Sequence, residues 1–280
     1  MRFMRTLVAG RHLPRKSSVR FLLILFLLPR ARRTGRIKIT IRNKIKTPLH
    51  SSHTLEKTLL LFDIDGTLLT TGGCGERALR LAVRDAFGVE DDLREIEIAG
   101  RTDTGIARQL LRKYGRAETD TEIAAVLENY LRHLPVLLRE TQGRLLPGVE
   151  ALLPLLQPRG DVVLGLLTGN LARGAEHKLS HYGVSDCFAF GAFADDHHER
   201  DRLGPFALSP AKERGHAVPL LRTFVIGDTP HDISCARAIG AKAVAVATGG
   251  FRAEQLASHT PDILLEDLGD IPATLRALGL

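Results

Sequence analysis

The segment 59–69, LLLFDIDGTLL, most constrains what this chain can fold into. Its apolar first half has the composition of a buried β-strand, and two carboxylates, Asp63 and Asp65, follow directly. In an extended backbone these two side chains share one face, because they are two residues apart. Burying like charges without partners is costly, so a counter-cation is needed. The segment therefore predicts a strand that ends in a cation site rather than in an ordinary acidic turn.

A second fully apolar run, VVLGLLT, occupies residues 162–168. It ends at Thr168 and passes through Gly169 and Asn170 into a predicted helix. A threonine hydroxyl and free backbone N–H groups at a helix start can bind an anion. We expect an anion site here, although a turn of this composition also caps many ordinary helices.

The segment 223–228, TFVIGD, repeats the pattern of a strand that ends in an acid. Asp228 closes it, and Asp232 follows within GDTPHD. Strands alternate with helices along the rest of the chain, which is typical of an α/β protein with a doubly wound parallel sheet. Ligands of such a sheet bind beyond the carboxyl ends of its strands, so Asp63, Thr168 and Asp228 are predicted to meet at one edge.

Together, the DIDGT motif at 63–67, the strand ending in Thr168 and the GDxxxD spacing from Asp228 resemble the motifs of the haloacid dehalogenase superfamily. Most members are Mg-dependent phosphatases. The resemblance covers about residues 57–280. It implies a Rossmann-like core with a helical cap inserted after the first strand, and it is strongest to the phosphoglycolate-phosphatase-like branch. Asp65 favours a phosphatase, because superfamily dehalogenases lack an acid at that position.

The resemblance gives the following domain organisation. Helical periodicity over 103–114 and 120–142, with no strand pattern between, predicts a helical cap at 75–145. The core is expected to comprise residues 55–74 and 146–280.

The resemblance also implies a cation, usually lysine, that faces the nucleophile and the phosphate. The chain has no KPxP motif at the expected place, which follows a predicted third strand at 186–193. Arg202 is the preferred candidate there, with Arg200 and Lys212 as alternatives.

In the reaction that the resemblance implies, a phosphate monoester is hydrolysed through an aspartyl-phosphate. Asp63 attacks phosphorus, and Asp65 protonates the leaving group and later deprotonates water. Mg²⁺ is held by Asp63, by the backbone carbonyl of Asp65 and by Asp228, while Asp232 positions the third-motif cation or a nearby water.

The phosphoryl oxygens are expected to contact Arg202 and the residues of the anion site, which are Thr168, Gly169 and Asn170. Arg101, at the start of a predicted cap helix, is a candidate for binding a distal anionic group of the substrate; a solvated charge pair explains it equally well.

The expected substrate is a small phosphorylated metabolite. A phosphomutase shares these motifs, and a non-catalytic binding protein can keep the fold, so both remain alternatives. The sequence leaves the oligomeric state open, a homodimer included. Three widely spaced cysteines form neither a metal-ligand pattern nor a disulfide framework, which favours the cytoplasm.

Residues 1–54 form a basic segment with 14 Lys and Arg and no acidic residue, which leaves 25 basic and 32 acidic residues in the remainder. A nucleic-acid interpretation rests on this segment alone, and we expect no nucleic-acid partner. Its apolar run at 21–28 is too short to span a bilayer, which needs about 20 residues. We interpret the segment as a disordered tail or a mis-assigned start, with the true start near Leu55. A signal peptide ranks third, because no small-residue cleavage site follows.

Overall fold

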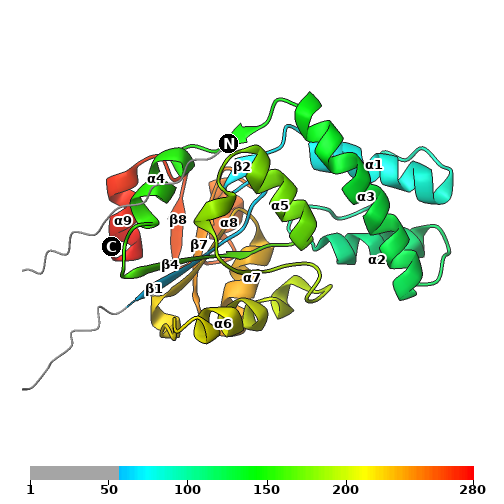
Figure 1. The fold of residues 1–280 in the computed structure, drawn as a ribbon. Helices are drawn as coiled ribbons and strands as arrows, with labels where there is room; N and C mark the ends of the chain where they lie inside the picture. The colour runs from blue at the N-terminus through cyan, green and yellow to red at the C-terminus, as the bar shows by residue number, and fades with distance from the viewer. Residues whose placement is uncertain (1–56) are drawn as a thin grey trace, which may run out of the picture. The chain divides into compact units, whose positions relative to one another are not determined.

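A six-stranded parallel sheet forms the centre of the fold, with the strand order β5-β4-β1-β6-β7-β8 (Figure 1). The computed structural model describes residues 57–280, so the predictions for residues 1–54 lie outside the described part. The strands are β1 Thr58–Phe62, β4 Val162–Leu167, β5 Gly191–Ala192, β6 Thr223–Gly227, β7 Lys242–Val246 and β8 Ile263–Leu265. The predicted doubly wound α/β fold is confirmed.

Helices cover both faces of the sheet, because β1 and its neighbours are apolar on both faces. Leu60 and Phe62 point to the face covered by α4, α5 and α9, and Leu59 and Leu61 point to the face covered by α6, α7 and α8. Alternate residues of a strand point to opposite faces, so every position of β1 is buried. The helices are α4 Val149–Leu156, α5 Ala172–His181, α9 Ile271–Leu278, α6 Gly204–Glu213, α7 Pro230–Ile239 and α8 Ala253–Ala257.

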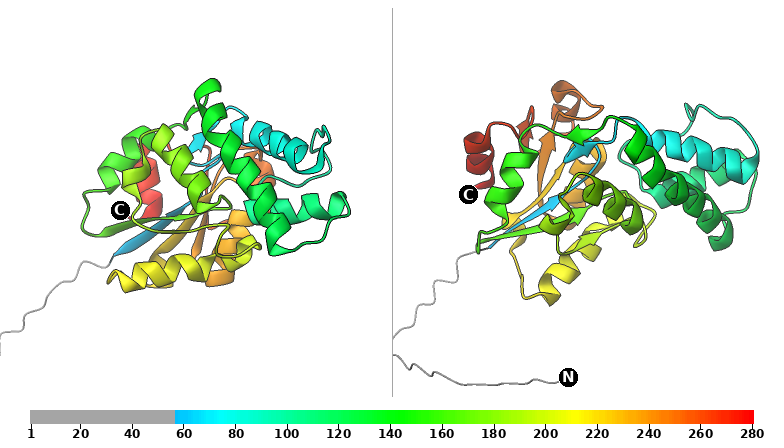
Figure 2. Two further views of the ribbon diagram at one scale, coloured as in Figure 1. Left: turned by 45° about the vertical axis from the view of Figure 1, so that its right-hand side comes forward. Right: turned by 45° about the horizontal axis from the view of Figure 1, so that its top comes forward.

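Three further helices, inserted after the first strand, form the helical cap (Figure 2). They are α1 Cys74–Phe87, α2 Asp103–Lys113 and α3 Asp120–Glu140. They bury their apolar faces mainly against one another, in a cluster separate from the two that flank the sheet. The two linkers pair as short antiparallel strands, β2 Leu69–Thr70 and β3 Arg144–Leu145. The helices match the periodicity of the sequence, and the domain boundaries at 75 and 145 stay a prediction.

The third strand is much shorter than the sequence predicts. Residues Ser185–Cys187 form a 3₁₀ turn in place of strand, and only Gly191–Ala192 pairs with β4. The turn uses its own backbone groups, since the Cys187 N–H donates to the Val184 carbonyl at 3.2 Å. Backbone groups that bond within this turn are not available to pair with β4 at the edge of the sheet.

Between residues 57 and 280, no helix combines the length and the apolar character that crossing a bilayer would require.

The central strand should be the most sensitive point of the fold. Leu61→Ala removes a side chain with 0% exposure and is expected to lower the free energy of unfolding by about 2–5 kcal/mol. Leu221→Ala is the control, because Leu221 is 76% exposed and should change stability by no more than about 0.5 kcal/mol. Urea unfolding of both variants measures the difference. Equal losses would contradict the assignment of β1 to the core.

Candidate active site

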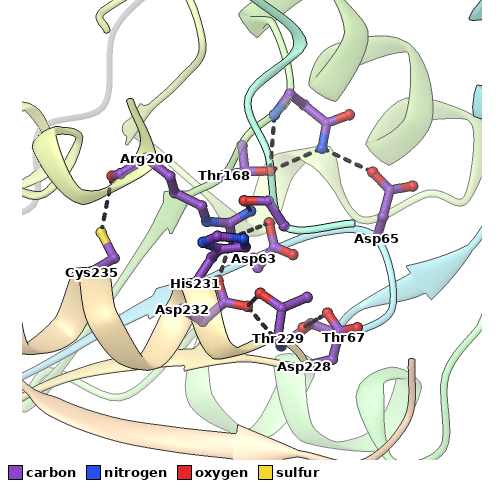
Figure 3. A network of polar contacts seen from close by, with 12 residues as sticks. Asp63, Asp65, Thr67, Thr168, Arg200, Asp228, Thr229, His231, Asp232 and Cys235 are labelled. Carbon is purple, nitrogen blue, oxygen red and sulfur yellow. Dashed lines mark hydrogen bonds and ion pairs between the residues drawn. The ribbon is translucent and has the colours of Figure 1, made fainter. Parts of the chain in front are cut away.

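Three adjacent strands bring the predicted residues together at the carboxyl edge of the sheet. Asp63 follows β1, Thr168 follows β4 and Asp228 follows β6, and β1 lies between the other two strands. All three side chains are buried. Figure 3 shows them converging with Arg200 and Asp232 on one network of polar contacts. The sequence predicted this convergence correctly because parallel strands all end at the same edge.

The carboxylates form a cluster that suits a divalent cation. Asp63, Asp228 and Asp232 each offer an oxygen within 4.8 Å of the others. Two glycines leave room beside Asp228: a Cβ at Gly66 would lie 2.4 Å from its Oδ2, and one at Gly249 would lie 1.7 Å from it. Carboxylate and carbonyl oxygens are the ligands that Mg²⁺ prefers. The donor set and the space around it therefore fit this ion.

The electrostatics of the cluster also favour a cation. Burial, together with the neighbouring carboxylates, raises the pKa of Asp228 to about 8. Burial raises the pKa of Asp63 to about 6, although Arg200 acts in the opposite direction. Such shifts mean that the buried site has too little positive charge for its carboxylates.

Arg200 is the arginine that faces Asp63, which corrects the preference for Arg202. The Arg200 side chain is 4% exposed, its Nη2 lies 3.0 Å from Asp63 Oδ1, and it also pairs with Asp232. The Arg202 side chain is 69% exposed and its Nε donates to Glu199 Oε2 at 2.7 Å. The two arginines lie in one 3₁₀ turn, where residues two apart point in different directions. Lys212, the other alternative, is exposed in the last turn of α6.

Asp232 holds Arg200 in place. Its Oδ1 accepts from Arg200, while its Oδ2 accepts from the Thr229 N–H at 3.0 Å and the Thr229 hydroxyl at 2.7 Å. The bond from the Thr229 N–H belongs to the capping box of α7, and the three bonds together fix the carboxylate. The structure therefore places Asp232 beside the buried cation, one of the two positions that the sequence analysis considered.

The predicted anion site lies between the core and the cap. Asn170 Nδ2 donates to Thr168 Oγ1 and to Asp65 Oδ2, both at 2.9 Å. Gly169 touches the cap so closely that a Cβ there would lie 2.2 Å from the Arg101 carbonyl. Of the three residues, Asn170 is the one that reaches Asp65, and it links Asp65 to the Thr168 hydroxyl.

Lys178 belongs to the site, and the sequence analysis missed it. This lysine of α5 is 3% exposed, and its Nζ lies 2.5 Å from Asp65 Oδ2 and 2.6 Å from Asn170 Oδ1. Burial disfavours the charged ammonium, but the surrounding acidic groups, with Asp65 first among them, together outweigh burial and raise the pKa of Lys178. The available signal was its spacing, because Lys178 falls on the buried stripe of α5 with Ala175 and Leu179.

A cavity of about 290 Å³ connects these residues with the cap. Its cap wall is largely apolar and includes Leu79, Ile98, Ile106, Leu127 and Tyr130. Arg101 also lines the cavity, but its side chain is 44% exposed and its Nε donates to Glu97 Oε2 at 2.9 Å. The structure thus leaves Arg101 at the cavity wall, paired with a carboxylate.

Sequence comparison identifies relatives over most of the described chain. The family model of the haloacid dehalogenase-like hydrolases matches residues 60–237. A probable phosphatase, IndB, from Dickeya dadantii is 26% identical over 79% of this chain and 95% of its own. The phosphoglycolate phosphatase of Synechococcus elongatus is 30% identical over 76% of this chain and 94% of its own, and that of Yersinia pestis is 27% identical over 78% and 92%.

Solved structures share the fold at lower identity. The protein CbbY from Rhodobacter sphaeroides, in complex with phosphate, has a TM-score of 0.65 and 22% identity over 80% of this chain and 100% of its own. A putative β-phosphoglucomutase from Bacteroides vulgatus has a TM-score of 0.61 and 20% identity over 81% and 90%. The family match covers well over half of the chain and includes Asp63, Thr168 and Asp228. This protein therefore belongs to the haloacid dehalogenase-like hydrolases.

Proposed function

We propose that this phosphatase hydrolyses a small phosphorylated metabolite through an aspartyl-phosphate, with Mg²⁺ as its cofactor. The observation that carries the proposal is the division of labour between the two aspartates after β1. Asp63 is 4% exposed and faces Arg200 and the other carboxylates, whereas the Asp65 side chain is 41% exposed and lines the cavity. A nucleophile held next to a cation and an acid open to the leaving group are what phosphoryl transfer needs.

In the first step, an Asp63 oxygen attacks phosphorus and the bond from phosphorus to the ester oxygen breaks. Asp65, as the carboxylic acid, gives its proton to the departing alkoxide, so that a neutral alcohol leaves. Arg200, with the Thr168 hydroxyl and the N–H groups of residues 169–170, binds the phosphoryl oxygens, over which charge spreads in the transition state.

In the second step, Asp65 is the base. Its carboxylate takes a proton from water as the water oxygen attacks phosphorus, and the bond between phosphorus and Asp63 breaks. Inorganic phosphate is released, and both aspartates return to their starting states.

The cation would be held by Asp63, by the backbone carbonyl of Asp65 and by Asp228. When bound, Mg²⁺ supplies positive charge that offsets the buried carboxylates and the phosphate dianion. Asp232 stays on Arg200, and both of its oxygens already accept hydrogen bonds.

Substrate selection belongs to the cap side of the cavity. We infer that Arg101 binds a distal anionic group, if the metabolite has one, in exchange for Glu97. The relatives named phosphoglycolate phosphatase act on a small anionic ester, and the size of the cavity suits a metabolite of that class. The three free cysteines agree with a cytoplasmic enzyme.

A phosphomutase is the second candidate, supported by the likeness in fold to a putative β-phosphoglucomutase. It would use the same residues and return the phosphoryl group from Asp63 to a sugar phosphate.

Hydrolysis of a panel of small phosphate monoesters by the full chain, with and without Mg²⁺, tests the proposed function. We expect Mg-dependent release of phosphate that is abolished in Asp63→Asn, because the amide oxygen is a poor nucleophile. Phosphate trapped on Asp63 by a sugar bisphosphate, without net hydrolysis, would establish the mutase instead. Inactivity in both assays would contradict both candidates and favour a binding protein.

The two neighbouring arginines provide a matched pair. Arg200→Ala should lower kcat/KM by about 100-fold or more, because it removes a buried cation from the transferring phosphoryl group. Arg202→Ala should change kcat/KM by no more than about twofold, because Arg202 is exposed and pairs with Glu199. Steady-state kinetics on the best ester of the panel compares them. A larger loss in Arg202→Ala would restore the original preference.

Protons should compete with Mg²⁺ for the cluster. With the pKa of Asp228 raised to about 8 and that of Asp63 to about 6, ligation below pH 8 must first displace a proton, and below pH 6 a second one. The affinity for Mg²⁺ should therefore fall about tenfold for each unit by which the pH is lowered from 8 to 6, and more steeply below pH 6. Calorimetric titration of Mg²⁺ at pH 5.5, 7 and 8.5 measures the slope. An affinity independent of pH would show that other groups hold the ion.

A further inference from the structure

Lys178 is a buried ammonium at the wall of the active-site cavity. Its side chain is 4% exposed, and Gly75 of the cap lies close to it, with 3.9 Å from the Nζ to the place that a Cβ would take. Burying a cation is costly, and an apolar residue would fill the same volume at no such cost. The hydrogen bonds of the Lys178 ammonium indicate why a charged side chain is buried at this position.

Lys178 and Asn170 hydrogen-bond to each other and to the same oxygen of Asp65. The Lys178 ammonium donates to Asp65 Oδ2 at 2.5 Å and to Asn170 Oδ1 at 2.6 Å. The Asn170 amide donates to the same Asp65 Oδ2 at 2.9 Å, and also to Thr168 Oγ1. Lys178 thus fixes which way the Asn170 amide faces. The two side chains together fix the Asp65 carboxylate through Oδ2, so its Oδ1 is the oxygen left for the substrate.

We propose that Lys178 is a positioning residue that holds Asp65 through Oδ2, so that Oδ1 delivers the proton to the leaving group and takes it from water. This inference rests on the proposed function, in which Asp65 is the acid and base. Lys178 also stabilises the carboxylate that Asp65 becomes when it gives up its proton. Its contribution is therefore realised in the transition state, where the proton moves.

A leaving-group comparison separates this role from a structural one. An alkoxide must be protonated as it departs, whereas p-nitrophenolate departs without a proton. The ratio kcat/KM reports the first phosphoryl transfer alone and is insensitive to the later attack of water. Losing the positioned acid should therefore lower kcat/KM for an alkyl ester and largely spare that for p-nitrophenyl phosphate. A general loss of folding or metal would lower both equally.

The experiment uses the full chain with Mg²⁺ and the variants Lys178→Met and Lys178→Gln. Each variant should lose about 100-fold or more in kcat/KM on the best alkyl phosphate and no more than about tenfold on p-nitrophenyl phosphate. Lys178→Gln keeps a polar side chain and carries the test if the methionine variant does not fold. Lys242→Met is the matched control: this half-buried lysine begins β7 and lies over the Phe224 ring, and its loss should affect neither substrate.

Asp65→Asn distinguishes failure of this inference from failure of the proposed function. If Asp65→Asn loses the alkyl ester selectively and both lysine variants lose the two esters equally, or lose neither, Lys178 does not position the acid. If Asp65→Asn itself shows no selectivity, the acid role of Asp65 is wrong, and the role of Lys178 falls with it.

Discussion

The burial of carboxylates at the end of one sheet is the constraint on which the rest of the site depends. Asp63, Asp228 and Asp232 are each no more than 4% exposed, and one guanidinium, that of Arg200, lies among them. Burial, with the neighbouring carboxylates adding to it, raises the pKa values of Asp63 and Asp228, and one positive charge does not offset three negative ones. In the proposed reaction, a divalent cation supplies the missing positive charge beside these carboxylates.

The two buried cations are divided between the two aspartates of the DIDGT motif. Arg200 pairs with Asp63, and Lys178 pairs with Asp65. In the proposed reaction the two aspartates have different tasks, because a nucleophile must be ionised when it attacks, while an acid must alternate between two protonation states. Separate cations allow the surroundings of each to be set independently. Asp232 and Asn170 are neither nucleophile nor acid in the proposed reaction. Both are buried and hydrogen-bonded because Asp232 orients Arg200 and Asn170 orients Lys178.

The start of α2 fastens the cap to the loop that carries the anion site. The Asp103 N–H donates to the Gly169 carbonyl at 2.7 Å, and Asp103 Oδ2 accepts from the Leu171 N–H at 2.8 Å. The Thr102 hydroxyl donates to the His198 carbonyl at 2.6 Å, next to the turn that presents Arg200. Cap and core therefore meet at both loops that bind phosphate in the proposed reaction. A displacement of α2 would disturb these loops directly.

The sequence by itself determined the strands other than β5, the order in which they end in Asp63, Thr168 and Asp228, and the helical cap between the first two. These features depend on the local hydrophobic pattern and on the rule that the carboxyl ends of parallel strands lie at one edge of the sheet. Both can be recognised from a single sequence. Only the tertiary structure decided which arginine faces Asp63 and that Lys178 faces Asp65. Each of those choices depends on how one turn or helix is rotated against its neighbours, and packing over the whole core sets that rotation.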